Sequence, residues 1–259
     1  MPTVSRYETP EAAYFAFLET FNARDATGWA GVNSWPHARV SAAADSTAHW
    51  RPPTRVFSDA EEYLAEPLWD DLEATGWARS QSLPPTVAQA SDDKAHIAGG
   101  WTRYDADDEP MAANRVVYVM TRTVDGWGIQ AQLKTDSFAD GVDFSSQERA
   151  AVAGVESALS LLNGGEIEAY CEALAYPFTL IGPPGVVIVI NSAAEMAEAM
   201  RGVGDDRLDA PPGSVQIVNC GSSGANVTFR VERDGVPQRA LALVGLRDGA
   251  WRMLAISGL

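Results

Sequence analysis

Hydrophobic residues follow two spacings along the first half of the chain. Thr9-Pro10-Glu11 is typical of a helix start, and the apolar residues after it recur at helical spacing. This apolar stripe consists of Tyr14, Phe17, Leu18 and Phe21. Farther along, apolar and polar residues alternate, which predicts strands over residues 95–105, 115–122 and 127–134. Helices followed by a meander of strands predict an α+β architecture with a curved antiparallel sheet.

The same pattern occurs twice. A shift of 141 positions places Leu18, Asn22, Trp29, Trp35 and Pro36 on Leu159, Asn163, Tyr170, Tyr176 and Pro177. The shift shortens along the chain and ends at 124, which pairs Trp127 with Trp251, so the second copy has shorter loops. A chain of 259 residues is long enough for two cores. We therefore predict two tandem domains, residues 1–140 and 141–259.

Composition narrows the function classes. The net charge of -16 repels phosphate groups, so we expect neither nucleic acid nor an anionic membrane as a partner. No apolar run is long enough for a membrane helix and residues 1–10 do not resemble a secretory signal, so a cytoplasmic protein is expected. Cys171 and Cys220 lack CxxC spacing and are expected to be free thiols. No nucleophile elbow, phosphate loop or HExxH motif is present, and we expect no cofactor and no metal.

Comparing the two copies separates candidate chemistry from packing. His37 and Arg39 share one face of a predicted strand, and Phe178 and Leu180 take their places in the second copy. In the same way Gln130 and Gln132 are replaced by Leu254 and Ile256, and Tyr104 by Val231. A buried polar cluster persists only when it is internally bonded, hydrated or filled by a ligand. We therefore predict a polar pocket in the first copy and a filled core in the second.

Aromatic residues are concentrated in the first copy as well. Seven of the eight tryptophans and all three histidines precede residue 140. Trp35, Trp101 and Tyr14 are candidates for the wall of a pocket that takes a flat ligand, with core packing as the alternative. Trp50 lies in a loop that is longer than the matching loop of the second copy. This loop is predicted either to cover the pocket or to be a surface loop without a special role.

Three segments resemble a known superfamily. They are Asn-Ala-Arg-Asp at residues 22–25, Trp-Pro-His-Ala-Arg-Val at 35–40 and Asp-Gly-Trp-Gly-Ile-Gln at 125–130. Both halves are similar to the nuclear transport factor 2-like (NTF2-like), or SnoaL-like, superfamily, which implies a cone-shaped sheet wrapped on helices around a pocket. The resemblance also implies either an enzyme or a binding module, often a homodimer. By register, the residues of the ketosteroid isomerase triad are replaced by Phe17, Ser41 and about Val117, so that triad is absent.

The favoured hypothesis is a cofactor-independent lyase acting on a small hydroxylated aromatic molecule, similar to the lignin diarylpropane lyase of that superfamily. His37 or Lys134 would handle a proton, and Tyr104 and Arg39 would hold oxygens. The expected substrate-binding residues are Trp35, Trp101, Gln130, Gln132, Trp50 and Tyr14. A non-catalytic module for a small molecule or a protein is the first alternative. An isomerase, dehydratase or epoxide hydrolase on a terpenoid, steroid or polyketide is the second.

Overall fold

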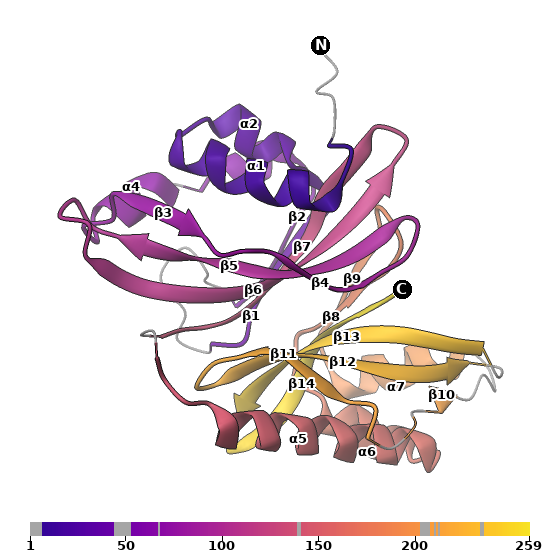
Figure 1. Ribbon diagram of the computed structural model, residues 1–259. Helices are drawn as coiled ribbons and strands as arrows, with labels where there is room; N and C mark the ends of the chain where they lie inside the picture. The colour runs from indigo at the N-terminus through magenta and orange to yellow at the C-terminus, as the bar shows by residue number, and fades with distance from the viewer. Residues whose placement is uncertain are drawn as a thin grey trace.

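The chain folds into four layers. The computed structural model describes residues 7–43, 53–66, 68–138, 141–202, 208–209, 211, 213–233 and 236–259. Two seven-stranded sheets lie against each other in the middle, and each sheet carries its helices on its other face (Figure 1). The predicted α+β architecture is confirmed.

The first unit supplies the upper helices and the upper sheet of Figure 1. Its helices are α1 (Pro10–Asn22), α2 (Ala26–Gly31), α3 (Ala60–Leu64) and α4 (Leu68–Glu73). Its strands are β1 (Asn33–Ser41), β2 (Thr54–Phe57), β3 (Arg79–Ser82), β4 (Thr86–Ala90), β5 (Lys94–Tyr104), β6 (Pro110–Thr123) and β7 (Gly126–Phe138). Thr9 caps α1 by accepting a hydrogen bond from the Ala12 N–H at 3.1 Å, as the sequence predicts. The helix and the three alternating strands lie where they were expected.

The second unit repeats this order. Its helices are α5 (Ser145–Asn163), α6 (Ile167–Ala173) and α7 (Ala193–Gly202). Its strands are β8 (Phe178–Ile181), β9 (Val187–Ile190), β10 (Leu208–Asp209), β11 (Gln216–Cys220), β12 (Gly224–Arg233), β13 (Val236–Arg247) and β14 (Ala250–Gly258). Both units carry a cis peptide bond before the proline of their first strand, at Trp35–Pro36 and Tyr176–Pro177.

Both sheets are mixed, which corrects the expectation of wholly antiparallel ones. The strand orders are β2-β1-β7-β6-β5-β3 and β10-β12-β13-β14-β8-β9, with β4 on β5 and β11 on β12. The pairs β1–β7 and β8–β14 are parallel, and the other pairs are antiparallel. Neighbouring strands joined by a hairpin must run antiparallel, whereas the first and last strands of a unit are far apart in sequence and can pair in either direction.

A β-bulge in the last strand of each unit changes which side chains face inward. Val119 pairs with Ala131 and Met120 with Ile129, which leaves Gln130 as an extra residue in β7. Leu243 pairs with Ala255 and Val244 with Met253, so Leu254 is the extra residue of β14. Gln130 and Ala131 therefore both face the second sheet, whereas Gln132 faces the helices of the first unit.

The two sheets share an apolar interface. From the first unit it takes Ala38, Val40, Ala42, Val117, Val119, Ala131 and Leu133, and from the second Ala175, Ile181, Leu241, Leu243, Leu254 and Ala255. Ala38 and Val40 lie on the face of β1 opposite His37 and Arg39, in agreement with the alternation of the sequence. Each of these side chains is less than one-tenth exposed. We name this surface the inter-sheet core.

Polar contacts surround the inter-sheet core. The Lys94 ammonium donates to Ile181 O and Gly182 O, both at 2.8 Å. The Gln130 amide donates to Pro183 O and Val186 O, both at 3.0 Å. The outer sheet faces are thus covered within one chain, and a homodimer would have to use another surface. Among the described residues, no helix is long and apolar enough to cross a membrane.

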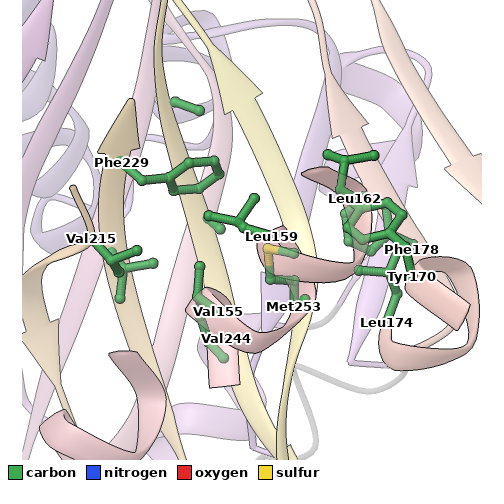
Figure 2. Close-up of a cluster of buried hydrophobic side chains, with 14 of the residues drawn as sticks. Val155, Leu159, Leu162, Tyr170, Leu174, Phe178, Val215, Phe229, Val244 and Met253 are labelled. Carbon is green, nitrogen blue, oxygen red and sulfur yellow. The ribbon is translucent and has the colours of Figure 1, made fainter. Parts of the chain in front are cut away.

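Hydrocarbon fills the space between α5 and the second sheet. Figure 2 shows Val155 and Leu159 from α5 facing Phe229, Val244 and Met253 of the sheet, with sulfur as the one heteroatom visible among these five. Among the described residues of this unit, the buried polar ones are Thr179, Asn226 and Ser257. Asn226 bonds to Leu133 O and Ser257 to His96, so these two belong to the contact between the units.

Candidate functional site

A cavity lies between the helices and the sheet of the first unit. It is partly open to solvent, and its free volume is about 30 Å³. The described residues that line it are Phe17, Leu18, Phe21, Trp29, Arg39, Tyr63, Leu68, Ser80, Trp101, Arg103 and Gln132. Aromatic rings from α1, α2, α3 and β5 form most of the wall. The polar lining comes from Arg39, Arg103, Gln132, Ser80 and Tyr63.

Arg39 carries a buried positive charge on this wall. Its guanidinium lies 4.5 Å from the Phe57 ring centroid and 5.3 Å from that of Tyr63. Its Nη2 donates to the Glu66 carboxylate, which also accepts from Arg55. Burial lowers the pKa of Arg39 to about 10, so it remains protonated near neutral pH. The site therefore holds a fixed cation among aromatic rings.

His37 lies on the same face of β1 as Arg39 but does not line the cavity, and its two ring nitrogens are occupied. Nδ1 lies 2.9 Å from Ile129 O, so it must carry the proton and donate. Nε2 then accepts from the Gln132 amide at 3.2 Å. Burial, together with the nearby Arg39 charge, lowers the pKa of His37 to about 3 despite the hydrogen bond to Ile129. In this arrangement His37 orients Gln132, which does line the cavity.

Several buried polar atoms around the cavity have no hydrogen-bond partner among the described residues. They are Trp29 Nε1, both side-chain atoms of Asn33, and the hydroxyls of Tyr63 and Tyr118. The residues concerned are at most 3% exposed. Trp29 and Tyr63 line the cavity with ring centroids 4.5 Å apart. The Asn33 and Gln132 amides approach the Tyr63 hydroxyl without the geometry of a full hydrogen bond, and this approach acts to lower its pKa. Burial nevertheless raises that pKa to about 12, so the hydroxyl keeps its proton and can donate.

Orphaned buried groups of this kind cost roughly 1–3 kcal/mol each, and native structures contain few of them. Two of these atoms, Trp29 Nε1 and the Tyr63 hydroxyl, belong to residues that line the cavity, where a ligand with oxygen or nitrogen atoms could bond to them.

Three of the other predicted residues lie at or beside the cavity. Trp101 and Gln132 line it. Trp35 does not line the cavity, but its ring packs against the lining residue Tyr63, with the ring centroids 5.6 Å apart. The Tyr14 hydroxyl already has partners within the protein: it donates to Leu83 O at 2.6 Å and accepts from the Gly100 N–H at 3.2 Å.

The remaining predicted residues are not brought to the cavity. The ring of Tyr104 lies 4.1 Å under the Arg79 guanidinium at the end of β5, and its neighbour Arg103 is the residue that lines the cavity. Lys134 is buried beside Ser41 on β1. Gln130 faces the second unit because of the bulge. Trp50 lies outside the described residues.

Sequence reasoning missed Tyr63, Glu66 and Arg103. Arg103 follows Trp101 by two positions in a strand, so strand alternation alone places the two on one face, and this signal was available. Tyr63 lies in the short helix α3, and Glu66 follows that helix, before α4 begins at Leu68. No periodic pattern in the sequence connects either residue to Arg39.

Replacing Tyr63 by phenylalanine is expected to leave the free energy of unfolding unchanged or to raise it by up to about 1 kcal/mol, because an unpaired buried hydroxyl is removed. Tyr14→Phe is the matched control. It removes a hydroxyl that is hydrogen-bonded, and should cost about 1 kcal/mol. Urea denaturation of both variants measures the difference. Equal destabilisation by the two substitutions would show that the Tyr63 hydroxyl has a partner within the protein.

One family of known proteins matches the first unit. The sequence profile of a family described as NTF2-like protein (DUF6841) matches residues 8–137, which are 130 of the 259 residues. Among curated proteins, none matches the chain.

Solved structures provide distant matches to about half of the chain. A calcium/calmodulin-dependent protein kinase type II association domain from Thiobacillus denitrificans is 20% identical, with 50% of this chain and 96% of that chain covered and a TM-score of 0.39. A ketosteroid isomerase-like protein from Erwinia carotovora atroseptica is 17% identical, with 50% and 94% covered and a TM-score of 0.37. An NTF-2 like protein of unknown function from Silicibacter pomeroyi is 17% identical, with 46% and 98% covered and a TM-score of 0.35.

Proposed function

Because the chain belongs to the NTF2-like protein family DUF6841, and one fold hosts many functions, its activity has to be argued from the site; we propose that the cavity of the first unit binds a small, flat, aromatic molecule. The observation that carries this proposal is the pair of buried donors without a described partner, Trp29 Nε1 and the Tyr63 hydroxyl, within an aromatic wall. In the second unit the corresponding space holds apolar side chains. We assign that unit, residues 141–259, a supporting role for the first, residues 1–140.

The aromatic wall and the polar atoms would make different contacts with the ligand. The rings of Phe21, Trp29 and Trp101 offer flat apolar contact, and aromatic pairs gain about 0.5–1.5 kcal/mol beyond the area they bury. Tyr63 and Trp29 offer hydrogen-bond donors at the polar end. The free volume of about 30 Å³ holds about two water molecules, so side chains of the wall must move to admit a ring.

Turnover of the ligand is the second candidate, and the protonated Tyr63 hydroxyl beside Arg39 favours it. In a lyase acting on a hydroxylated aromatic substrate, Tyr63 would protonate the leaving benzylic hydroxyl. The C–O bond would break with its electron pair leaving on water, while the ring phenolate supplies electrons to form a quinone methide. Arg39 would stabilise the tyrosinate that remains. Tyr63 thereby takes the proton-transfer role for which the sequence suggested His37 or Lys134.

A screen of hydroxylated one- and two-ring aromatic compounds against the full chain tests both candidates. Thermal shift reports binding, while new conjugated absorbance from the quinone methide reports turnover. A rise in melting temperature without product supports the binding module, and product formation that Tyr63→Phe abolishes supports the lyase. Compounds that neither bind nor react across the whole panel would overturn the proposed function.

A further inference from the structure

Two arginines line the cavity of this acidic protein. Arg39 and Arg103 line it, and none of the described lining residues is acidic. The whole chain, in contrast, carries a net charge of -16. Two guanidinium groups placed on one small cavity fit an anionic ligand better than a neutral one, because planar guanidinium groups pair with carboxylates through two parallel hydrogen bonds.

Glu66, which is not among the lining residues, already pairs with the Arg39 guanidinium that such a ligand would bind. Its carboxylate accepts from Arg39 on one oxygen and from Arg55 on the other. Side-chain exposure rises outward along this triad, from 6% for Arg39 to 13% for Glu66 and 34% for Arg55. The carboxylate thus stands between the buried guanidinium and the surface.

The backbone around Glu66 differs from that around Arg39. Arg39 lies within β1, which pairs with β2 on one side and β7 on the other. Glu66 lies between the ends of two short helices, α3 and α4. Moving Glu66 therefore disturbs fewer backbone hydrogen bonds than moving Arg39.

We propose that the ligand of this cavity is an aromatic carboxylate and that Glu66 is a built-in competitor, which the ligand's carboxylate displaces from Arg39. The proposal rests on the proposed binding function and names its ligand class. Glu66 sets specificity in this scheme, because a neutral ligand gains nothing that would offset the loss of the Arg39–Glu66 pair. Displaced from Arg39, Glu66 keeps Arg55 as its partner at the surface.

The test uses the full chain and two matched pairs of probes, benzoate with benzamide and 2-naphthoate with 2-naphthamide. Calorimetry gives the dissociation constants for the wild type, Glu66→Gln and Glu73→Gln. Glu73 is the control because its carboxylate pairs with Arg24 on the surface, where the two side chains are 48% and 44% exposed. Glu66→Asp, which keeps the charge and shortens the side chain, is a second variant in case Glu66→Gln folds poorly.

We expect Glu66→Gln to bind the two carboxylates roughly tenfold to a hundredfold tighter than the wild type, since the competing carboxylate is gone and the charge-assisted hydrogen bonds remain. Binding of the amides should change less than about twofold, and Glu73→Gln should behave as the wild type. Glu66→Asp should lie between the wild type and Glu66→Gln.

Two outcomes count against the account and can be told apart. Equal effects of Glu66→Gln on carboxylates and amides, or tighter binding of the amides by the wild type, overturn the assignment of the ligand class and leave the binding function in place. Failure of every probe to bind any of the variants overturns the binding function, and the ligand class with it.

Discussion

Lowering the pH from 8 to 5 is expected to cost the protein about 4 kcal/mol of unfolding free energy, because two buried histidines stay neutral in the folded state. Burial lowers the pKa of His37 and of His96 to about 3. Both values lie below the reference of about 6.5, so in this range the unfolded chain binds protons that the folded chain does not. Stability therefore rises with pH between about 3 and 6.5.

The hydrogen bonds explain why neither imidazole accepts a second proton. His96 Nδ1 accepts from the Gln89 amide at 2.8 Å, and its Nε2 donates to the Ser257 hydroxyl at 2.9 Å. His37 accepts from the Gln132 amide in the same way. Protonation would place an N–H against an N–H in both cases, inside a buried environment.

Urea denaturation at pH 8 and pH 5 measures this loss of stability. His37→Gln and His96→Gln should each reduce the difference between the two pH values by about half, whatever their effect at pH 8. A wild-type difference below about 1 kcal/mol would contradict the neutral, buried assignment of both residues.

Val119→Asp should destabilise the protein by more than about 4 kcal/mol, since it places a carboxylate in the inter-sheet core with no partner. Val119 is 0% exposed and packs in that core between the two units. Val124→Asp is the matched control, because Val124 is fully exposed at the turn after β6 and should tolerate the change within about 0.5 kcal/mol.

Melting temperature and urea midpoint compare the two aspartate variants. A Val119→Asp protein as stable as Val124→Asp would show that the two units do not depend on their contact. If the wild type unfolds in one transition and Val119→Asp unfolds in two, one for each unit, the inter-sheet core is confirmed as the contact that joins the units.

The fold was predictable because periodic patterns and internal repetition survive in the sequence. The stripe at Tyr14 and Phe17 defined α1, and the alternation at His37 and Arg39 assigned both faces of β1 correctly. Strand alternation depends on the backbone alone, and the same backbone recurs in both units. The direction of pairing between β1 and β7 was not readable, since no hairpin joins them.

The site was predictable only in part. Arg39 and Gln132 line the cavity, as the comparison of the two copies suggested, and Trp101, predicted from the concentration of aromatic residues, lines it too. Gln130 was placed on the same face as Gln132, and the bulge in β7 turns it to the second unit. An extra residue in a strand inverts the alternation beyond it and leaves no mark in the hydrophobic pattern.

The sequence also could not show that both ring nitrogens of His37 are hydrogen-bonded within the protein. Its hydrogen bonds to Ile129 and Gln132 come from another strand, and these contacts depend on the register between β1 and β7. A histidine near neutral pKa in a predicted pocket suggests proton transfer until its partners are known. The same limit applies to Glu66, which meets Arg39 through a tertiary contact.

One measurement tests the claim that the first unit binds a ligand, whereas the second unit is filled by its own apolar side chains. It is a calorimetric titration of the full chain with the strongest aromatic ligand, for the wild type, for Gln132→Ile and for Leu159→Met. Gln132→Ile introduces into the cavity the side chain that the second unit has at Ile256, whereas Leu159→Met alters the apolar core of that unit. We predict one binding site per chain. Gln132→Ile should weaken the affinity at least about tenfold, because a polar contact with the ligand is lost, and Leu159→Met should leave the affinity unchanged. Two sites per chain, or binding that Leu159→Met abolishes and Gln132→Ile leaves intact, would contradict it.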